Sequence, residues 1–142
     1  MTIRIATGDD LEIIAGYDPH IAPSELETTI RLGRAAVAEE DGEFLGWMRW
    51  NLFWDNTPFL NMLFLLPPHR GKGHGKAMMV WWEHQMALEG YGTVMTSTAA
   101  EEYAQHFYVN LGYAAIGGFV PFGESYELLF GKKLPPQPDV AP

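Results

Sequence analysis

The chain has no cysteine among its 142 residues, which excludes disulfide bonds, thiolate metal sites and a cysteine nucleophile. It has no apolar run of membrane-spanning length, and no charged start followed by a long apolar stretch. No pair of histidines stands with carboxylates at the spacing of metal ligands. We therefore expect a soluble, cytoplasmic protein with no metal and no membrane partner.

The chain is also poor in positive charge. Lysine and arginine together number 9 against 18 aspartates and glutamates, so the formal net charge is −9. Such a surface repels nucleic acid, and no basic cluster is dense enough to override that repulsion. The negative charge either attracts a small cationic substrate or only keeps the protein in solution.

Hydrophobic residues are plentiful and make up 47% of the chain, with aromatics at 13%. This composition and length suit one domain with a single core, which we place at residues 1–134. Residues 135–142 are rich in proline and lack apolar periodicity, so we expect a disordered tail there.

Apolar spacing and turn residues predict the order β, α, α, β, β, β, α, β, α, β, β, which implies a mixed α/β sheet with helices on both faces. Asp41-Gly42 is a strong signal for a two-residue hairpin. Ser24 and Glu27 have the spacing of a capping box at the start of the second helix. We expect strands at 2–7, 35–39, 43–51, 59–66, 93–98, 113–120 and 125–133, and helices beginning near 9, 24, 77 and 101.

A glycine-rich turn follows the fourth predicted strand. The apolar run ends at Pro67-Pro68, and Gly71, Gly73 and Gly75 lead into a helical pattern. Glycines let a backbone approach a ligand closely, and amides that converge at a helix N-terminus favour an anion. The segment therefore predicts a phosphate-binding site.

Spacing argues against two common phosphate loops. A nucleotide P-loop needs glycine at the position of Arg70 and serine or threonine at the position of Ala77. A dinucleotide-binding turn needs its third glycine where Lys76 stands.

The pattern Arg70-x-x-Gly73-x-Gly75 after a strand resembles the acetyl-CoA pyrophosphate loop of the GNAT superfamily of N-acyltransferases. The later segment 104–113 is similar to the family's second motif, Ala-x-x-Phe-Tyr-x-x-x-Gly-Phe/Tyr. The resemblance covers roughly residues 3–134. It implies a mixed, mostly antiparallel sheet of about six or seven strands flanked by helices on both faces.

The resemblance also implies roles for individual residues. The backbone of Phe64 and Leu65 would pair with the pantetheine arm of the coenzyme. Tyr108 matches the family's general acid near the coenzyme sulfur, although it also fits as one more aromatic on an amphipathic helix. Lys72 and Lys76 either add charge to the loop or are solvated cations. The pyrophosphate would be held by Arg70, Gly71, Lys72, Gly73, His74, Gly75 and Lys76.

Departures from the family pattern leave parts of the site open. The strand before the loop carries Asn61 and no carboxylate, so the acceptor's proton is expected to leave through water. Glu101 stands where relatives often have an asparagine that contacts pantetheine. We expect His106 to be exposed and Trp47 to lie in the core, and we leave Trp54 and Asp55 open as acceptor-pocket residues.

The predicted function is transfer of an acetyl group from acetyl-CoA to a primary amine, on a small molecule or a peptide, by direct attack in a ternary complex. Two alternatives are a non-catalytic CoA-binding or interaction module and an acyltransferase with another acyl donor. A homodimer formed through the terminal hairpin is also open.

Overall fold

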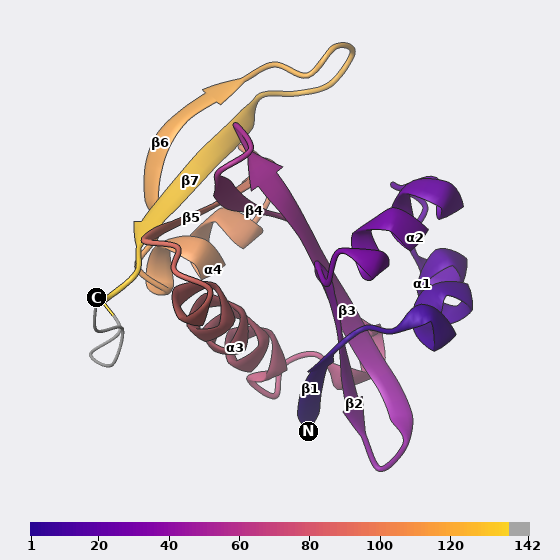
Figure 1. The fold of residues 1–142 in the computed structure, drawn as a ribbon. Helices are drawn as coiled ribbons and strands as arrows, with labels where there is room; N and C mark the ends of the chain where they lie inside the picture. Colours follow the sequence, from indigo (N-terminus) through magenta and orange to yellow (C-terminus); the bar gives the residue numbers. More distant parts are fainter. Residues whose placement is uncertain (137–142) are drawn as a thin grey trace. The chain divides into compact units, whose positions relative to one another are not determined.

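The computed structural model describes residues 1–136 and contains seven strands and four α-helices in the predicted order (Figure 1). The strand order is β1-β2-β3-β4-β5-β7-β6. The pairs β1–β2, β2–β3, β5–β7 and β6–β7 are antiparallel, whereas β4–β5 is parallel. The predicted mixed, mostly antiparallel α/β fold is therefore confirmed.

The chain forms two compact units. The first unit comprises Met1–Asn51 and Asn61–Trp81, and the second comprises Leu52–Leu60 and Trp82–Pro142. The strands β3 (Glu43–Phe53) and β4 (Thr57–Leu65) and the helix α3 (His74–Leu88) each contribute residues to both units.

A tight hairpin organises the first unit. β2 (Ala35–Glu40) turns into β3 at Asp41 and Gly42, whose φ angles of 52° and 79° are those that an Asp-Gly turn of this type needs. β1 (Thr2–Ile5) pairs with the other edge of β2, with Ile3 opposite Ala38.

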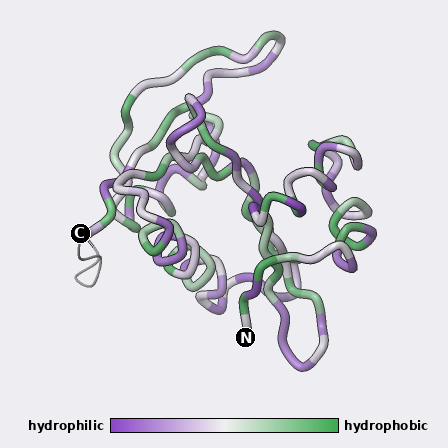
Figure 2. Tube along the Cα trace, viewed as in Figure 1, coloured by the Kyte–Doolittle hydropathy of each residue, from purple (hydrophilic) through white to green (hydrophobic). Residues whose placement is uncertain are grey.

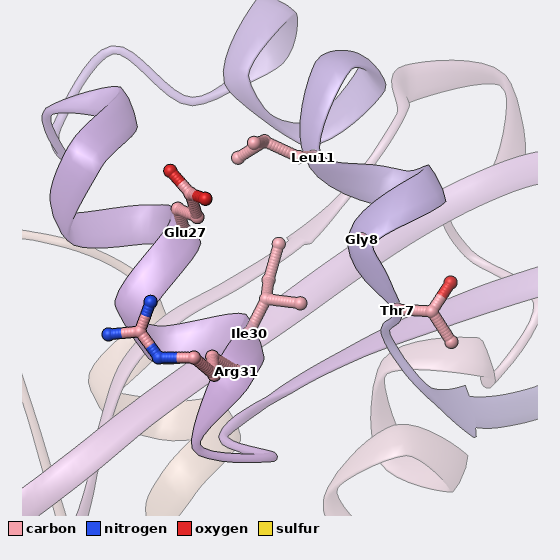
Figure 3. A pocket seen from close by; sticks show the side chains of 6 residues that line it. All are labelled: Thr7, Gly8, Leu11, Glu27, Ile30 and Arg31. Atoms are coloured by element: carbon pink, nitrogen blue, oxygen red, sulfur yellow. The ribbon is translucent and has the colours of Figure 1, made fainter.

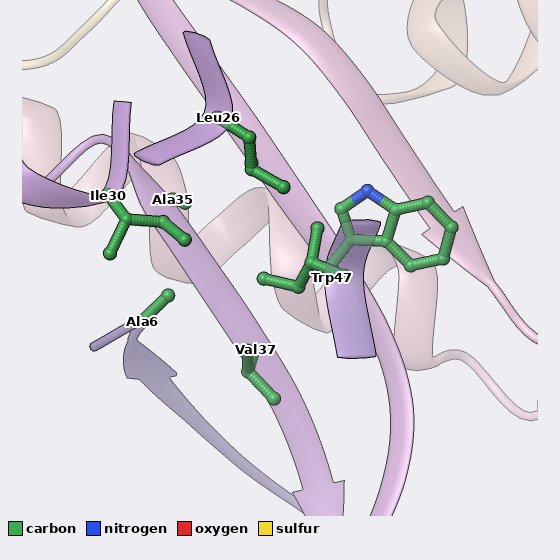
Figure 4. Packing of buried hydrophobic residues seen from close by; sticks show 7 residues of the cluster. Ala6, Leu26, Ile30, Ala35, Val37 and Trp47 are labelled. Carbon is green, nitrogen blue, oxygen red and sulfur yellow. The ribbon is translucent and has the colours of Figure 1, made fainter. Parts of the chain in front are cut away.

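Two helices cover the inward side chains of this sheet. α1 (Leu11–Tyr17) follows a 3₁₀ turn, η1 (Gly8–Asp10), and α2 (Pro23–Arg31) follows after a short loop. Hydrophobic and hydrophilic residues alternate along both helices (Figure 2), and the buried ones are Ile14 on α1 and Leu26 and Ile30 on α2. Figure 4 shows the resulting core, built from Ala6, Leu26, Ile30, Ala35, Val37 and Trp47, with Ile14 also buried.

The start of α2 corrects a prediction. Ser24 lies inside the helix rather than at its N-cap, which is Ala22, and no side chain caps this end. Pro23 takes the first helical position, where its missing N–H costs nothing and its fixed φ favours the helix. The proline therefore sets the boundary in place of the expected Ser24–Glu27 capping box.

The second unit is built around β5 (Thr93–Ala99), β7 (Glu127–Lys133) and β6 (Ala114–Phe119). β7 lies between the other two strands and pairs with both, so the predicted terminal hairpin is confirmed. α4 (Ala104–Asn110) begins later than the expected residue 101, because residues 100–103 form turns. β4 begins at Thr57, two residues before the expected start.

Residues 137–142, most of the predicted tail, lie outside the described residues. Within residues 1–136, no helix combines the length and apolarity needed to cross a bilayer.

Candidate functional site

The glycine turn leaves β4 and enters α3 within the first unit. A short 3₁₀ turn, η2 (Pro67–His69), follows the strand, and α3 begins at His74. Gly71 and Gly73 have φ angles of 77° and 81°, a region that side chains with a Cβ adopt at a cost. A Cβ at either glycine would meet no atom within 4 Å, so the surface above the turn is open.

The backbone amides of this turn point to no protein acceptor. Among the hydrogen bonds of residues 1–136, none is donated by a backbone amide from Gly71 to Lys76. The first bond of the helix comes from Ala77, which donates to the Gly73 carbonyl at 3.1 Å. Unpaired donors at the N-terminal end of a 15-residue helix form a site suited to an anion. We call residues 71–76 the amide cradle.

Arg70 differs from the other predicted pyrophosphate residues. Its amide donates to the Pro67 carbonyl at 3.3 Å, so it is not free for a ligand. Its Nε donates to the Leu65 carbonyl at 2.8 Å, and its guanidinium lies 4.8 Å from the centre of the Phe64 ring. The side chain of Arg70 thus ties the cradle to the end of β4.

The end of β4 is held very close to β3. The Leu66 amide donates to the Leu45 carbonyl at 2.9 Å, and a Cβ on Gly46 would collide with the Phe64 carbonyl oxygen. The Phe64 ring also packs at a tilt of 33° against the buried Trp47 ring, with 5.0 Å between centroids. The backbone of Phe64 and Leu65, predicted to pair with pantetheine, is therefore firmly placed, although Arg70 already occupies one acceptor site of the Leu65 carbonyl.

Positive charge gathers around the cradle in an otherwise acidic chain. Arg70, Lys72 and Lys76 fall within seven positions, and both lysines are exposed with no ion-pair partner among residues 1–136. His69 lies 3.3 Å from Glu43 at the base of the turn, and His74 is half-buried at the helix start. This charge favours an anionic group over the cradle.

Tyr108 lies on α4 in the second unit and is 8% exposed. Its ring packs edge-on against Tyr113 at 5.7 Å between centroids and lies tilted against Phe130 at 6.1 Å. Burial raises the pKa of the Tyr108 hydroxyl; the nearby Thr96 hydroxyl opposes this shift, and the charge of Glu102 adds to it. The phenol therefore stays protonated at neutral pH.

The remaining residues singled out from the sequence differ in burial and in their partners. Trp47 is buried, as expected for core, and His106 is exposed. Trp54 is 80% exposed, and both it and Asp55 have positive φ in the turn before β4. Glu101 accepts a hydrogen bond from the Ser125 hydroxyl at 2.9 Å, which gives it a structural partner within the second unit.

A buried ion pair was not predicted. The side chain of Asp18 is fully buried and accepts bonds from Arg49 Nε at 2.7 Å, from Trp47 Nε1 at 3.0 Å and from the His20 amide at 3.0 Å. Burial acts to raise the pKa of Asp18, but these donors outweigh it and the pKa is lowered. The available signal was Arg49 itself, because a charged residue within an apolar strand needs a buried partner.

Two hollows of the first unit lie near α2. One, of about 360 Å³, lies between α2 and the start of α1, with Glu27, Ile30 and Arg31 on one side and Thr7, Gly8 and Leu11 on the other (Figure 3). The second, of about 260 Å³, lies where α2 meets β3 and β4, and Asn61 of β4 lines it. Within residues 1–136, no cluster of histidine, aspartate and glutamate could hold a metal ion.

Solved structures share this fold at low sequence identity. An acetyltransferase of the GNAT family from Bacillus cereus has a TM-score of 0.75 at 21% identity, over 93% of this chain and 96% of its own. The ribosomal-protein-S18-alanine N-acetyltransferase from Escherichia coli has a TM-score of 0.79 at 14% identity, over 99% and 98% of the two chains. The yncA protein from Salmonella typhimurium, solved with its cofactor acetyl-CoA, has a TM-score of 0.77 at 20% identity, over 99% of each chain.

A comparison with curated proteins found no match. The model of the Acetyltransferase (GNAT) family, in contrast, matches residues 11–113. This range includes α1 and α2, the strand before the cradle, the cradle itself and the helix that carries Tyr108. The chain therefore belongs to the GNAT family of acetyltransferases.

Proposed function

We propose that residues 1–134 act as one domain that transfers an acetyl group from acetyl-CoA to a primary amine. The observation that carries this proposal is the amide cradle, whose backbone donors have no protein acceptor among residues 1–136. Unpaired donors that converge at a helix start are expensive unless water or an anion satisfies them. A diphosphate with several acceptor oxygens suits this need.

The residues beside the cradle fit the rest of the coenzyme. Lys72 and Lys76 supply positive charge next to the proposed diphosphate position. Phe64 and Leu65 form the end of β4, and residues 61–65 of this strand have no ladder partner within the first unit other than β3. A pantetheine arm that pairs with the backbone of residues 61–65 would be fixed by backbone bonds alone.

In the proposed reaction, the amine nitrogen attacks the thioester carbonyl carbon, so that a C–N bond forms and the C–S bond breaks. The products are an acetamide and the free thiol, and one proton passes from the amine to the sulfur. Tyr108 donates its hydroxyl proton towards the leaving sulfur and is reprotonated from the amine, directly or through water. Its raised pKa keeps the required proton in place at neutral pH.

Before it attacks, the acceptor must lose the extra proton of its ammonium form. We propose that this proton leaves through water, since no carboxylate stands on β4. The E. coli relative acts on an alanine of a ribosomal protein, and another structural neighbour is an aminoglycoside 6'-N-acetyltransferase, so both a peptide and a small molecule are suitable acceptor classes for this fold. The cytoplasmic location and the homodimer remain predictions.

The first experiment separates an enzyme from a binding module. Tyr108→Phe removes only the hydroxyl, and the ring contacts with Tyr113 and Phe130 remain. We expect kcat for acetyl transfer to fall about 100-fold, while the dissociation constant of acetyl-CoA changes less than twofold. Unchanged kcat would remove Tyr108 from the chemistry. Acetyl-CoA binding without transfer to any amine of a broad panel would favour the non-catalytic module.

The second experiment tests the cradle. Gly73→Glu places a negative charge and a Cβ on the open side of the turn, so we expect acetyl-CoA binding to be lost in calorimetric titration. Gly123→Glu is the matched control, because Gly123 has a similar φ of 79° and equally open surroundings in the β6–β7 turn. Normal binding by Gly73→Glu would contradict the assignment of the cradle.

A further inference from the structure

The hollow where α2 meets β3 and β4 has the composition of a ligand pocket. We call it the α2 pocket; all of its lining residues belong to the first unit. Ile21, Leu32 and Trp50 form apolar wall, and the remaining residues are polar or charged. These polar and charged residues are Glu25, Thr28, Thr29, Arg34, Arg49, Asn51 and Asn61.

Arg34 is the unusual member of this set, because the other arginines are engaged. Arg4 pairs with Asp10 and Glu39, and Arg49 pairs with Asp18. Arg31 donates to the Thr28 hydroxyl, and Arg70 donates to the Leu65 carbonyl. The guanidinium of Arg34 has no hydrogen bond or ion pair within residues 1–136, although the residue is half-buried. A guanidinium held in a concavity without an anion is a binding group for a carboxylate.

The backbone fixes Arg34 in this place. Its amide donates to the Thr29 carbonyl at the end of α2, and its carbonyl accepts from the Trp50 amide on β3, both at 3.0 Å. The backbone of Arg34 is therefore fixed between helix and sheet, so binding a ligand there costs no backbone ordering at this residue.

Two asparagines on neighbouring strands add paired polar groups. Asn61 Nδ2 donates to Asn51 Oδ1 at 2.8 Å, so the two carboxamides orient each other. This bond leaves the side-chain Nδ2 protons of Asn51 and the side-chain Oδ1 of Asn61 without a partner in residues 1–136. The first can donate to a carboxylate and the second can accept from an amine.

Charge in the pocket is nearly balanced, in contrast to the chain as a whole. Asp18 neutralises Arg49, which leaves Arg34 and the exposed Glu25, neither of which has an ion-pair partner among the described residues. A polycation would meet the repulsion of Arg34, and a simple anion would meet that of Glu25. A molecule that carries both a carboxylate and an amine satisfies both groups.

We propose that the α2 pocket binds the carboxylate of the acetyl acceptor and that this acceptor is an amino acid or a similar small amino carboxylate. This inference rests on the proposed acetyl transfer. Arg34 and the side-chain Nδ2 of Asn51 hold the carboxylate, and the side-chain Oδ1 of Asn61 accepts a hydrogen bond from the amine. Asn61 and Leu65 lie on the same strand about 13 Å apart at 3.3 Å per residue, so one strand serves both the acceptor and the pantetheine arm.

The test compares acceptors that differ only at the carboxylate. Acetyl-CoA consumption is measured with each standard amino acid, with its carboxamide and with its decarboxylated amine. We expect at least one amino acid to exceed its carboxamide and amine tenfold or more in kcat/KM. Arg34→Gln should raise KM for that amino acid at least tenfold, leave kcat within threefold and leave activity on the carboxamide unchanged.

Arg31→Gln is the matched control, since Arg31 is an exposed arginine three residues away that lines the other hollow. It should alter none of these values.

Equal turnover of amino acids, carboxamides and amines, or equal kinetics of Arg34→Gln and the unchanged protein, would overturn the inference while acetyl transfer stood. If no acceptor is turned over, calorimetric titration of the same panel into the CoA-saturated protein tests the pocket directly. Amino acid binding that depends on Arg34 supports the pocket, and its absence overturns it. Loss of acetyl-CoA binding itself would instead count against the proposed function.

Discussion

At the scale of single residues, the buried carboxylate of Asp18 stabilises the fold through donors from three segments. Arg49, Trp47 and the His20 amide all donate to it, which joins the loop after α1 to the centre of β3. Removing one member of a buried pair leaves the other charge without compensation. Asp18→Asn should therefore lower the free energy of unfolding by about 3–5 kcal/mol in urea titration. Asp9→Asn, at an exposed aspartate, should change it little, and a similar loss in both variants would contradict this role.

The lowered pKa of Asp18 gives a second residue-scale prediction. A group whose pKa is lower in the folded state adds stability above its unfolded pKa, here 3.8, and loses it as the pH falls through the folded value. The unchanged protein should therefore lose this part of its stability only below about pH 4. Asp18→Asn lacks the titrating group, so its unfolding free energy should fall less steeply between pH 4 and pH 2. Parallel curves for the two proteins would show that Asp18 does not titrate on unfolding.

At the scale of elements, the close approach of β3 and β4 places the strand end that leads into the cradle. A methyl group at Gly46 would collide with the Phe64 carbonyl, so Gly46→Ala must displace the end of β4. We expect a loss of about 1–3 kcal/mol in stability and at least tenfold weaker acetyl-CoA binding. Gly16→Ala on α1 is the control, because a Cβ there meets nothing within 4 Å. That control should leave binding unchanged and raise stability by about 0.5 kcal/mol.

The elements also show how far sequence reasoning reaches. The Asp41-Gly42 hairpin was predictable because the turn needs two positive φ angles that these residues tolerate. The turn at Gly71 and Gly73 was predictable because its positive φ angles favour glycine. The start of α2 was misjudged because two local signals compete there, and Pro23 prevails over Ser24. The residues proposed to hold the coenzyme form one continuous segment, so a sequence pattern can predict them. The α2 pocket joins Arg34, Asn51 and Asn61 from separate segments, and no local spacing connects them.

At the scale of the whole molecule, continuity of elements argues for one cooperative unfolding transition. β4 contributes Thr57–Leu60 to the second unit and Asn61–Leu65 to the first, and α3 is divided at Trp81 and Trp82. Unfolding either unit would remove part of a strand and part of a helix from the other. Calorimetry should therefore show a single transition in which the calorimetric and van't Hoff enthalpies agree.

Thermal unfolding in the presence of acetyl-CoA tests directly whether the two units unfold together. The cradle and the β4 end lie in the first unit, so acetyl-CoA at 100 times its dissociation constant should stabilise that unit by about 2.7 kcal/mol. If the molecule unfolds as one, the whole transition should move upward by about 5–10 °C without splitting. Gly73→Glu should unfold in one transition that acetyl-CoA does not move, because its cradle cannot bind. Two resolved transitions, of which acetyl-CoA shifts only one, would show that the units unfold independently and that residues 1–134 are not a single domain.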